Sequence, residues 1–411
     1  HPNGLSFIAE TWWMGDLLDV DSYRVSASKQ QSISMLLDDV SYRSNYRLTE
    51  AETPYLQLDE CNEQTLRFAK AVKARALECK VLNDASVIEA LGGLQSLSVD
   101  GGEATAMDLS ALKALEELYI ADLPLESLQL PQSGNLQSIK IRKATLKSLD
   151  VSAQTALESL HLESVPVQTL KLPQGADSFG VLSVIDSELS EIDLQDVPKL
   201  RQLTLTSNNL RGLDVSRNVA LTELVITDGF LTSFLLPGNS NVVSLDLSRQ
   251  KLQELTIELV PALRTIDVSG NQLSSLDLSN ADNVYQLRAD DNQLESLTLP
   301  ARELLTLFSA KNNKFTELNL SGSYLYAISV SGNPLTSIDF SLTPLQVLDI
   351  DESVLSAAQL AVLKGKTNLT LNGEKGDAGS VSDAGTATML NCLDTLSNIA
   401  DLSKVTTLKC G

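Results

Sequence analysis

The chain repeats one leucine-rich pattern about every 21 residues over most of its length, and this repeat limits what it can fold into. We take the fourth position of the pattern LxxLxL as position 0 and count the other positions from it. The spacing between successive 0 positions is 20 to 22 residues, and position +2 is apolar in all fourteen rows. One such unit cannot bury its own leucines, whereas stacked units form a continuous core, so the pattern predicts a repeat solenoid. Position 0 is occupied by Leu97, Leu118, Ile139, Leu160, Leu182, Leu203, Leu224, Leu245, Ile266, Leu287, Phe308, Ile328, Leu348 and Leu369.

A second apolar segment follows in most rows at positions +7 and +10, as in Leu273 and Leu276. The two segments of a row are too close together for a full helix between them, so each row is expected to hold two short strands. Asparagine stands at position +5 in five rows, where its amide can bond the backbone of neighbouring turns. These residues are Asn208, Asn271, Asn292, Asn313 and Asn333.

These patterns, seen most clearly in Leu263–Leu278 (LRTIDVSGNQLSSLDL), resemble those of the leucine-rich repeat family over roughly residues 76–372. The resemblance implies a horseshoe or right-handed superhelix of about 14 turns with a parallel β-sheet on its concave side. It also implies a second short strand in each turn and α-helical caps at both ends. The 21-residue period with LDLS is similar to that of internalin-type bacterial surface proteins, and short repeats of this kind also occur in ectodomains of receptor-like kinases.

The ends of the chain depart from the repeat. Residues 1–75 hold both tryptophans and are expected to form an N-terminal cap, because a solenoid needs its terminal leucines covered. The aromatic residues there either pack over the first turn or form a contact surface. Residues 76–372 are expected to form the solenoid, and residues 373–411 a loop and a C-terminal cap.

The four cysteines lie in two pairs, each separated by 18 residues and each near one end of the chain. Bonds between the two ends are impossible across a long solenoid, so two local disulfides are expected, with free thiols as the alternative. A helix at residues 63–75 that leads into a strand at 77–82 would bring the first pair together, and residues 387–400 and 404–409 repeat this arrangement. The expected bonds join Cys61 to Cys79 and Cys392 to Cys410.

Two disulfides would indicate an oxidising compartment and therefore an extracellular location. Two sequons, at Asn319 and Asn368, are candidate glycosylation sites.

Charge and motifs exclude several classes of function. The 31 basic and 53 acidic side chains give a net charge of −22, which argues against nucleic acid and against docking on an anionic membrane. The sequence has no apolar run of 18 residues that could span a bilayer. It has only His1 and His161 as histidines and lacks the motifs of the common hydrolases, zinc enzymes and nucleotide-binding proteins. We expect no catalytic activity in this chain and no cofactor, although a kinase domain beyond Gly411 would be compatible.

Candidate binding residues come from the strand alternation, which turns positions +1 and +3 outward on the concave face. One group is basic and aromatic and suits an acidic or glycan ligand, and the next rows are neutral. In later rows Asp246 and Asp267 lie one rung apart, so either Arg288 or, as a weaker alternative, a bound Ca²⁺ would offset their repulsion. Asp349 and Asp351 extend this acidic series. The candidates are Tyr119, Lys140, Arg142, His161, Glu163, Thr204, Thr206, Asp246, Asp267, Arg288, Asp290 and Lys311.

The sequence thus predicts an extracellular recognition domain that binds a protein, peptide or glycan on its concave face. We favour the ligand-binding ectodomain of a cell-surface receptor of the receptor-like kinase type, with a possible membrane anchor after Gly411. The alternatives are an internalin-like bacterial adhesin or host-interaction protein and a secreted enzyme inhibitor. The paired cysteines argue against a cytosolic scaffold.

Overall fold

The computed structural model describes residues 22–25, 55–71, 73–300, 304–321, 323–340, 345 and 347–364. The chain divides into two compact units, His1–Asn209 (unit 1) and Leu210–Gly411 (unit 2). Row fourteen, at Leu369, lies outside the described residues, as do the expected C-terminal cap, Cys392, Cys410 and Asn368. None of the described helices is long and apolar enough to cross a bilayer.

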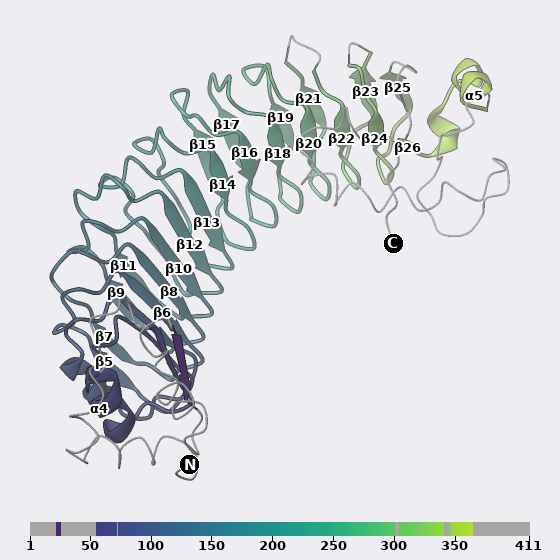
Figure 1. Cartoon of the computed structure of the whole chain (residues 1–411). Helices are drawn as coiled ribbons and strands as arrows, with labels where there is room; N and C mark the ends of the chain where they lie inside the picture. The colour runs from purple at the N-terminus through teal and green to yellow at the C-terminus, as the bar shows by residue number, and fades with distance from the viewer. Residues whose placement is uncertain are drawn as a thin grey trace, which may run out of the picture. The chain divides into compact units, whose positions relative to one another are not determined.

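Unit 1 is built on an inner parallel sheet to which each row contributes one strand (Figure 1). Residues at position 0 of successive rows pair directly, as Ile139 does with Leu160 and Leu160 with Leu182. The predicted solenoid register is therefore confirmed. From β4 onward the strands are β4 (Ser96–Val99), β6 (Glu117–Ala121), β8 (Ser138–Arg142), β10 (Ser159–Glu163), β12 (Val181–Ile185) and β13 (Gln202–Thr206).

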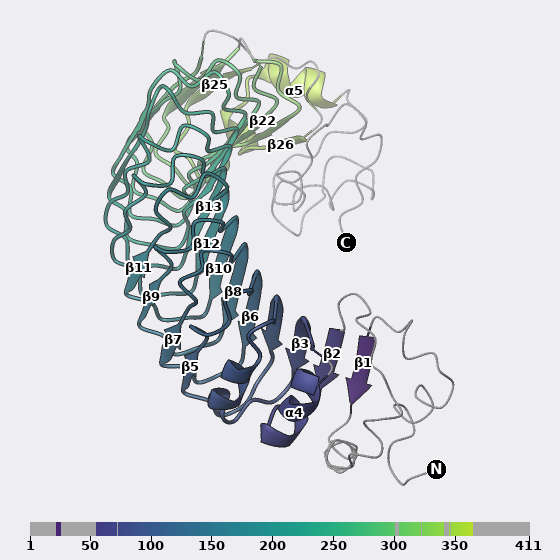
Figure 2. The ribbon, with the colours of Figure 1, turned by 60° about the vertical axis from the view of Figure 1, so that its left-hand side comes forward.

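The inner sheet of unit 1 begins before the first row that the sequence pattern shows. Strands β1 (Ser22–Val25), β2 (Tyr55–Leu58) and β3 (Ala76–Cys79) lie side by side and pair in parallel, and β3 pairs with β4 (Figure 2). Two of these strands fall within the segment that we expected to be a cap. The rows of β2 and β3 do not match the LxxLxL pattern, because its first leucine is replaced by Thr53 before β2 and by Ala74 before β3.

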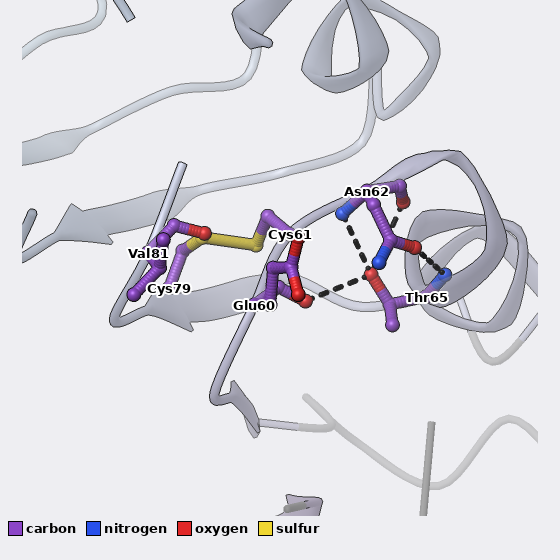
Figure 3. The surroundings of a disulfide bond; sticks show 6 residues. All are labelled: Glu60, Cys61, Asn62, Thr65, Cys79 and Val81. Carbon is purple, nitrogen blue, oxygen red and sulfur yellow. Dashed lines mark hydrogen bonds between the residues drawn. A yellow bond between two sulfur atoms is a disulfide. The ribbon is translucent and has the colours of Figure 1, made fainter. Parts of the chain in front are cut away.

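A helix and a disulfide connect β2 to β3. Helix α4 (Glu63–Ala71) begins at Asn62, whose Oδ1 accepts a hydrogen bond from the Thr65 backbone N–H at 3.1 Å. The helix ends before the predicted limit at residue 75. The chain then returns along β3, which brings Cys61 and Cys79 together with their Cα atoms 5.8 Å apart, and the expected disulfide is present (Figure 3). A short 3₁₀ helix, η2 (Ala85–Ala90), follows β3.

Unit 2 continues the same construction. Its inner strands are parallel, and position 0 again pairs with position 0, as in Leu245 with Ile266. The inner strands are β14 (Glu223–Val225), β16 (Ser244–Asp246), β18 (Thr265–Asp267), β20 (Gln286–Arg288), β22 (Leu307–Ser309), β24 (Ala327–Ser329) and β26 (Val347–Asp349). They are followed by the 3₁₀ helix η3 (Glu352–Val354) and helix α5 (Ala357–Lys364).

Short outer strands form pairs on the other side of the turns, which confirms a second strand in most rows; the rows of β12 and β13 have none. In unit 1 these are β5 (Ala106–Asp108) with β7 (Ser127–Gln129) and β9 (Ser148–Asp150) with β11 (Thr169–Lys171). In unit 2 they are β15 (Ser233–Leu236) with β17 (Glu254–Ile257), β19 (Ser275–Asp277) with β21 (Ser296–Thr298), and β23 (Glu317–Leu320) with β25 (Ser337–Phe340). Aliphatic side chains of the inner and outer strands fill the space between them.

The asparagines at position +5 bond the backbone of neighbouring turns, as predicted. The side-chain amide of Asn292 donates to the carbonyl oxygens of Val268 (2.9 Å), Ala289 (3.3 Å) and Asp290 (3.1 Å). Its Oδ1 accepts from the backbone N–H of Leu273 at 3.1 Å. Asn271 and Asn313 make equivalent bonds.

One row replaces this asparagine with a longer side chain. Gln250 donates to the carbonyl of Ile226 at 3.0 Å and accepts from the N–H of Leu231 at 3.0 Å. Position +5 of the preceding row is Gly229, where a Cβ atom would lie 2.7 Å from Oε1 of Gln250. The glycine thus makes room for the extra methylene group of the glutamine.

Each inner strand from β6 to β24 ends in a residue with left-handed backbone geometry at position +4. In unit 1 this residue is Asp122, Lys143, Ser164, Asp186 or Ser207, with φ between 48° and 54°. Unit 2 continues the series with Asp228, Arg249, Gly270, Asp291, Asn312 and Gly332, with φ between 54° and 74°. In these rows the repeated turn sends the chain away from the inner sheet at the same point.

Candidate ligand-binding face of the inner sheet

The outward face of the inner sheet is built by the alternation within each strand. In β10, Leu160 and Leu162 are buried, whereas Ser159, His161 and Glu163 remain partly exposed. The same alternation in β8 and β12 places positions +1 and +3 of three rows side by side on one face.

The five predicted residues of rows two to four form one group on this face of unit 1, the basic–aromatic cluster: Tyr119, Lys140, Arg142, His161 and Glu163. At position +1, Tyr119 pairs with Lys140, and Lys140 pairs with His161. The Lys140 ammonium group lies 5.8 Å from the centre of the Tyr119 ring, within range of a cation–π contact. At position +3, Nε of Arg142 lies 2.7 Å from a carboxylate oxygen of Glu163.

The electrostatics of the cluster leave it positively charged. The Tyr119 hydroxyl and the Glu163 carboxylate raise the pKa of Arg142. Burial and the nearby Lys140 charge lower the pKa of His161, so this ring is neutral near pH 7. One glutamate against one lysine and one arginine gives a net charge of +1 in a chain whose net charge is −22.

The next two rows are uncharged at positions +1 and +3. Thr204 of β13 pairs with Ser183 of β12, and Thr206 pairs with Ile185; all four side chains are partly exposed. They form a neutral border to the basic–aromatic cluster.

In unit 2 the two aspartates at position +1 are direct neighbours, as predicted. Asp246 pairs with Asp267, and Asp267 pairs with Arg288, whose Nε lies 3.5 Å from the Asp267 carboxylate. Each aspartate also accepts a backbone hydrogen bond at 2.9 Å, Asp246 from Ser248 and Asp267 from Ser269. Arg288 therefore offsets the charge of Asp267, as the first of the two expectations stated, whereas the Asp267 charge still raises the pKa of Asp246.

Nothing in the described part of the chain supports the Ca²⁺ alternative, because no three His, Cys, Asp or Glu side chains there come close enough to hold a metal ion.

Two aspartates that we expected on the exposed face are buried, and that expectation is wrong for them. Asp290, 5% exposed, accepts hydrogen bonds from the Ser309 hydroxyl at 2.6 Å and the Lys311 N–H at 2.7 Å. It therefore joins two rows of the solenoid and does not face a ligand. Asp349 is also buried, whereas Lys311 is partly exposed and Asp351 is exposed.

The predicted candidate residues do not include the side chains at position +4, which form ion pairs between neighbouring rows. Asp122 pairs with Lys143 at 2.9 Å in unit 1. In unit 2, Arg249 makes two bonds to Asp228, at 2.6 and 2.9 Å. The sequence does show charged residues of opposite sign 21 positions apart, which indicates ion pairs between neighbouring rows. The alternation of side chains predicts only which residues within a strand face outward, so it gives no prediction for position +4.

The sequon residue Asn319 lies on the outer strand β23 and is exposed. Its Oδ1 accepts hydrogen bonds from the N–H and the hydroxyl of Ser321 at 3.0 and 2.7 Å. Aspartates such as Asp277 make the same backbone bond at the equivalent position of other rows. Glycosylation of Asn319 stays a prediction.

We expect the substitution Asp246→Asn to stabilise the protein at neutral pH and to have no effect at acidic pH. Burial and then the Asp267 charge raise the pKa of Asp246, so its ionisation opposes folding once the pH exceeds its unfolded-state pKa of about 3.9. Asparagine keeps an acceptor for the Ser248 N–H. The gain at pH 7 should lie between roughly 0.2 and 1 kcal/mol, the range of cross-strand charge pairs, and should vanish at pH 3.

Chemical denaturation of both proteins at pH 7 and pH 3 measures this difference. Asp214→Asn is the matched control, because backbone and side-chain bonds from Ser216 lower the pKa of Asp214 and its substitution should destabilise the protein at pH 7. An Asp246→Asn variant that is less stable than the natural protein at pH 7 contradicts the interpretation.

No protein-family model and no curated protein sequence matches this chain. Several solved structures have a similar fold. The functional domain of InlJ from Listeria monocytogenes is 22% identical, with a TM-score of 0.53 over 70% of each chain. YopM, a leucine-rich effector protein from Yersinia pestis, is 23% identical, with a TM-score of 0.54 over 77% of this chain and 85% of YopM. A chain of the LRIM1/APL1C complex is 16% identical, with a TM-score of 0.50 over 82% of this chain and 64% of that chain.

Proposed function

Because this chain has the leucine-rich-repeat fold, we propose that it is an extracellular recognition domain that binds an acidic segment of a protein ligand. The observation that carries this proposal is the basic–aromatic cluster of unit 1, a positive, partly exposed group on a strongly acidic protein. Tyrosine and arginine are the side chains that most often contribute large binding energies at protein interfaces.

The mechanism is surface complementarity without chemical change. Parallel strands hold Tyr119, Lys140 and His161 at the same position of three successive rungs, about 4.8 Å apart. Because each side chain stands on a hydrogen-bonded strand, little backbone order is gained on binding, so the entropic cost of association is small. We propose recognition and not catalysis for this face.

The disulfide between Cys61 and Cys79 supports an extracellular location, because such bonds persist in oxidising compartments. We propose in addition that the chain is the ligand-binding part of a cell-surface receptor.

We expect the double substitution Lys140→Ala and Arg142→Ala to weaken ligand binding at least about tenfold, since each removes a charged contact of the kind that carries interface energy. The probe is an arrayed library of acidic, tyrosine-containing peptides, with the affinity of the best binders measured by biolayer interferometry. Lys171→Ala is the control, because Lys171 is an exposed lysine paired with Asp150 at 2.9 Å on the outer strands.

The result that would reject this site is equal binding by the natural protein and the double variant, or an equal loss with Lys171→Ala. A library without any binder that depends on Lys140 and Arg142 rejects it as well. Heparin oligosaccharides serve as a second probe, and selective binding of heparin would replace the peptide with a sulfated glycan.

A further inference from the structure

A row of side chains runs along one edge of the inner sheet of unit 2, at position −2, directly before strands β16, β18, β20, β22 and β24 (Figure 1). Backbone hydrogen bonds link this position between neighbouring rows. The N–H of Thr306 donates to the carbonyl of Tyr285 at 2.9 Å, and the N–H of Tyr326 donates to the carbonyl of Thr306 at 2.8 Å. All side chains of this row are partly or fully exposed, and we call them the edge ladder: Val243, Arg264, Tyr285, Thr306 and Tyr326.

The edge ladder and its surroundings are rich in aromatic side chains for this protein. Aromatic residues make up only 4% of the chain, yet three of its eight tyrosines are Tyr285, Tyr324 and Tyr326. Tyr324 and Leu304 stand at position −4 of two successive rows and are 65% and 47% exposed. Exposed apolar side chains that gather in one place indicate a contact surface, and tyrosine is enriched at such surfaces.

The spacing of the two ladder tyrosines matches one kind of peptide. Tyr285 and Tyr326 stand two rungs apart, about 9.6 Å along the sheet, with the smaller Thr306 between them. A polyproline II helix advances about 9.3 Å in its three-residue turn. A peptide that lies along the ladder and carries proline at every third position therefore places successive prolines against successive tyrosines.

The polar groups of the edge ladder suit the same ligand. A polyproline II helix has no internal hydrogen bonds, so its carbonyl groups need external donors, which tyrosine hydroxyls can supply. Nη1 of Arg264 donates to three backbone carbonyls of its own turn at 2.8 to 3.1 Å, which directs its charge at that turn. Asp282, three residues before Tyr285, is partly exposed. In a chain of net charge −22, this carboxylate favours a basic residue in the ligand.

We propose that the edge ladder of unit 2 binds a proline-rich segment of a partner protein in the polyproline II conformation, with a lysine or arginine of that segment paired to Asp282. Such a segment loses little conformational freedom on binding, because the polyproline II helix is already formed in the free peptide. No two of the 12 prolines in these 411 residues stand three positions apart, so these residues do not supply the segment themselves. The site is independent of the basic–aromatic cluster, which lies in unit 1 and suits an acidic ligand.

An arrayed library of peptides with the pattern Pro-x-x-Pro-x-x-Pro and one arginine or lysine tests the proposal on the full chain. The affinity of the best binders is measured by fluorescence anisotropy. We expect Tyr285→Ala with Tyr326→Ala to weaken this binding at least about tenfold, because tyrosines carry a large share of interface binding energy. Tyr285→Phe with Tyr326→Phe keeps the rings and should lose less.

Phe230→Ala is the matched control, because it removes another exposed ring of unit 2, at position +6 and outside the edge ladder. Equal binding by the natural protein and the double alanine variant overturns the proposal, as does an equal loss with Phe230→Ala. A library without any binder that depends on the two tyrosines overturns it as well.

The spacing of the prolines provides a test that needs no substitution in the protein. Peptides with the same composition but with prolines four positions apart should bind the natural protein at least about tenfold more weakly, because such prolines do not lie on one side of a three-residue turn. This comparison decides the matter if the alanine variant does not fold. Equal affinity for both spacings overturns the proposal.

Two further measurements identify the ligand class. Asp282→Asn should weaken binding of an arginine-containing peptide about two- to fivefold, the range of exposed ion pairs, and should not change binding of the same peptide with glutamine in place of arginine. An equal effect on both peptides overturns the charge contact. Neutral oligosaccharides also stack on tyrosine rings, and binding of these oligosaccharides in place of the peptides, lost with Tyr285→Ala and Tyr326→Ala, overturns the peptide as the ligand.

Discussion

Replacing Asn292 with leucine is expected to lower the free energy of unfolding by about 3 kcal/mol. The side chain is buried and bonds the carbonyls of Val268, Ala289 and Asp290 and the N–H of Leu273. Leucine has almost the same shape, so the substitution leaves these backbone groups without their partner and creates little cavity. Each buried polar group left without a partner costs roughly 1–3 kcal/mol. Some of these backbone groups keep other hydrogen bonds, so we expect the total to lie at the low end of the summed range.

Chemical denaturation measures the global effect of Asn292→Leu, and hydrogen exchange should show faster opening of β18, β20 and β22 than of β4 to β8. The loss of stability is expected to be local, because each turn contacts mainly the turns beside it. The matched control is Gln250→Asn, which restores the residue found at this position in other rows and should be close to neutral. A stability unchanged by Asn292→Leu would show that the amide contributes no net stabilisation to the turn.

Removing the disulfide with Cys61→Ser and Cys79→Ser is expected to cost about 3 kcal/mol. The bond closes a loop with a sequence separation of 18, and in the chain-entropy model a 15-residue loop contributes about 3 kcal/mol. The loop contains α4, and the bond holds the start of this helix against the end of β3. The loss should therefore be confined to β2, α4 and β3.

The measurement is urea denaturation of the natural protein and the double variant, with and without reductant, together with peptide mass mapping. Reductant should lower the midpoint of the natural protein and of a Cys392→Ser, Cys410→Ser control, which keeps the first bond. If Cys61 and Cys79 are found as free thiols in protein secreted into an oxidising medium, both the bond and the argument for an extracellular location fail.

The periodic part of the fold follows from the sequence because a solenoid is specified by local repetition. The leucines at position 0 pair row by row as the spacing predicts, and the amides of Asn271, Asn292 and Asn313 bond neighbouring turns. Strands β1 and β2 were not predicted because strand pairing needs only two alternating apolar positions, whereas the repeat pattern also has a large apolar residue at position −3. In β2, Leu56 and Leu58 occupy the two alternating apolar positions, whereas position −3 is Thr53.

The candidate site was predicted in part. Alternation placed Tyr119, Lys140 and His161 on one face, because these depend only on strand register. It failed at Asp290, where the chain has already left the strand and the carboxylate turns back to bond Ser309. Side-chain direction after a strand depends on the turn, and this turn is set by the left-handed residue at position +4, a property that residue type alone does not reveal.

The uniform register of the rows also governs how a gene for this chain can change length. Duplication or loss of one whole row, such as the 21 residues that separate Ile266 from Leu287, would place every remaining position 0 opposite another position 0. A single inserted codon inside a strand would instead turn its charged residues into the core and its leucines into water. Changes in length are therefore expected to occur as gains or losses of whole rows. Each such change would add or remove all the outward-facing side chains of a row together.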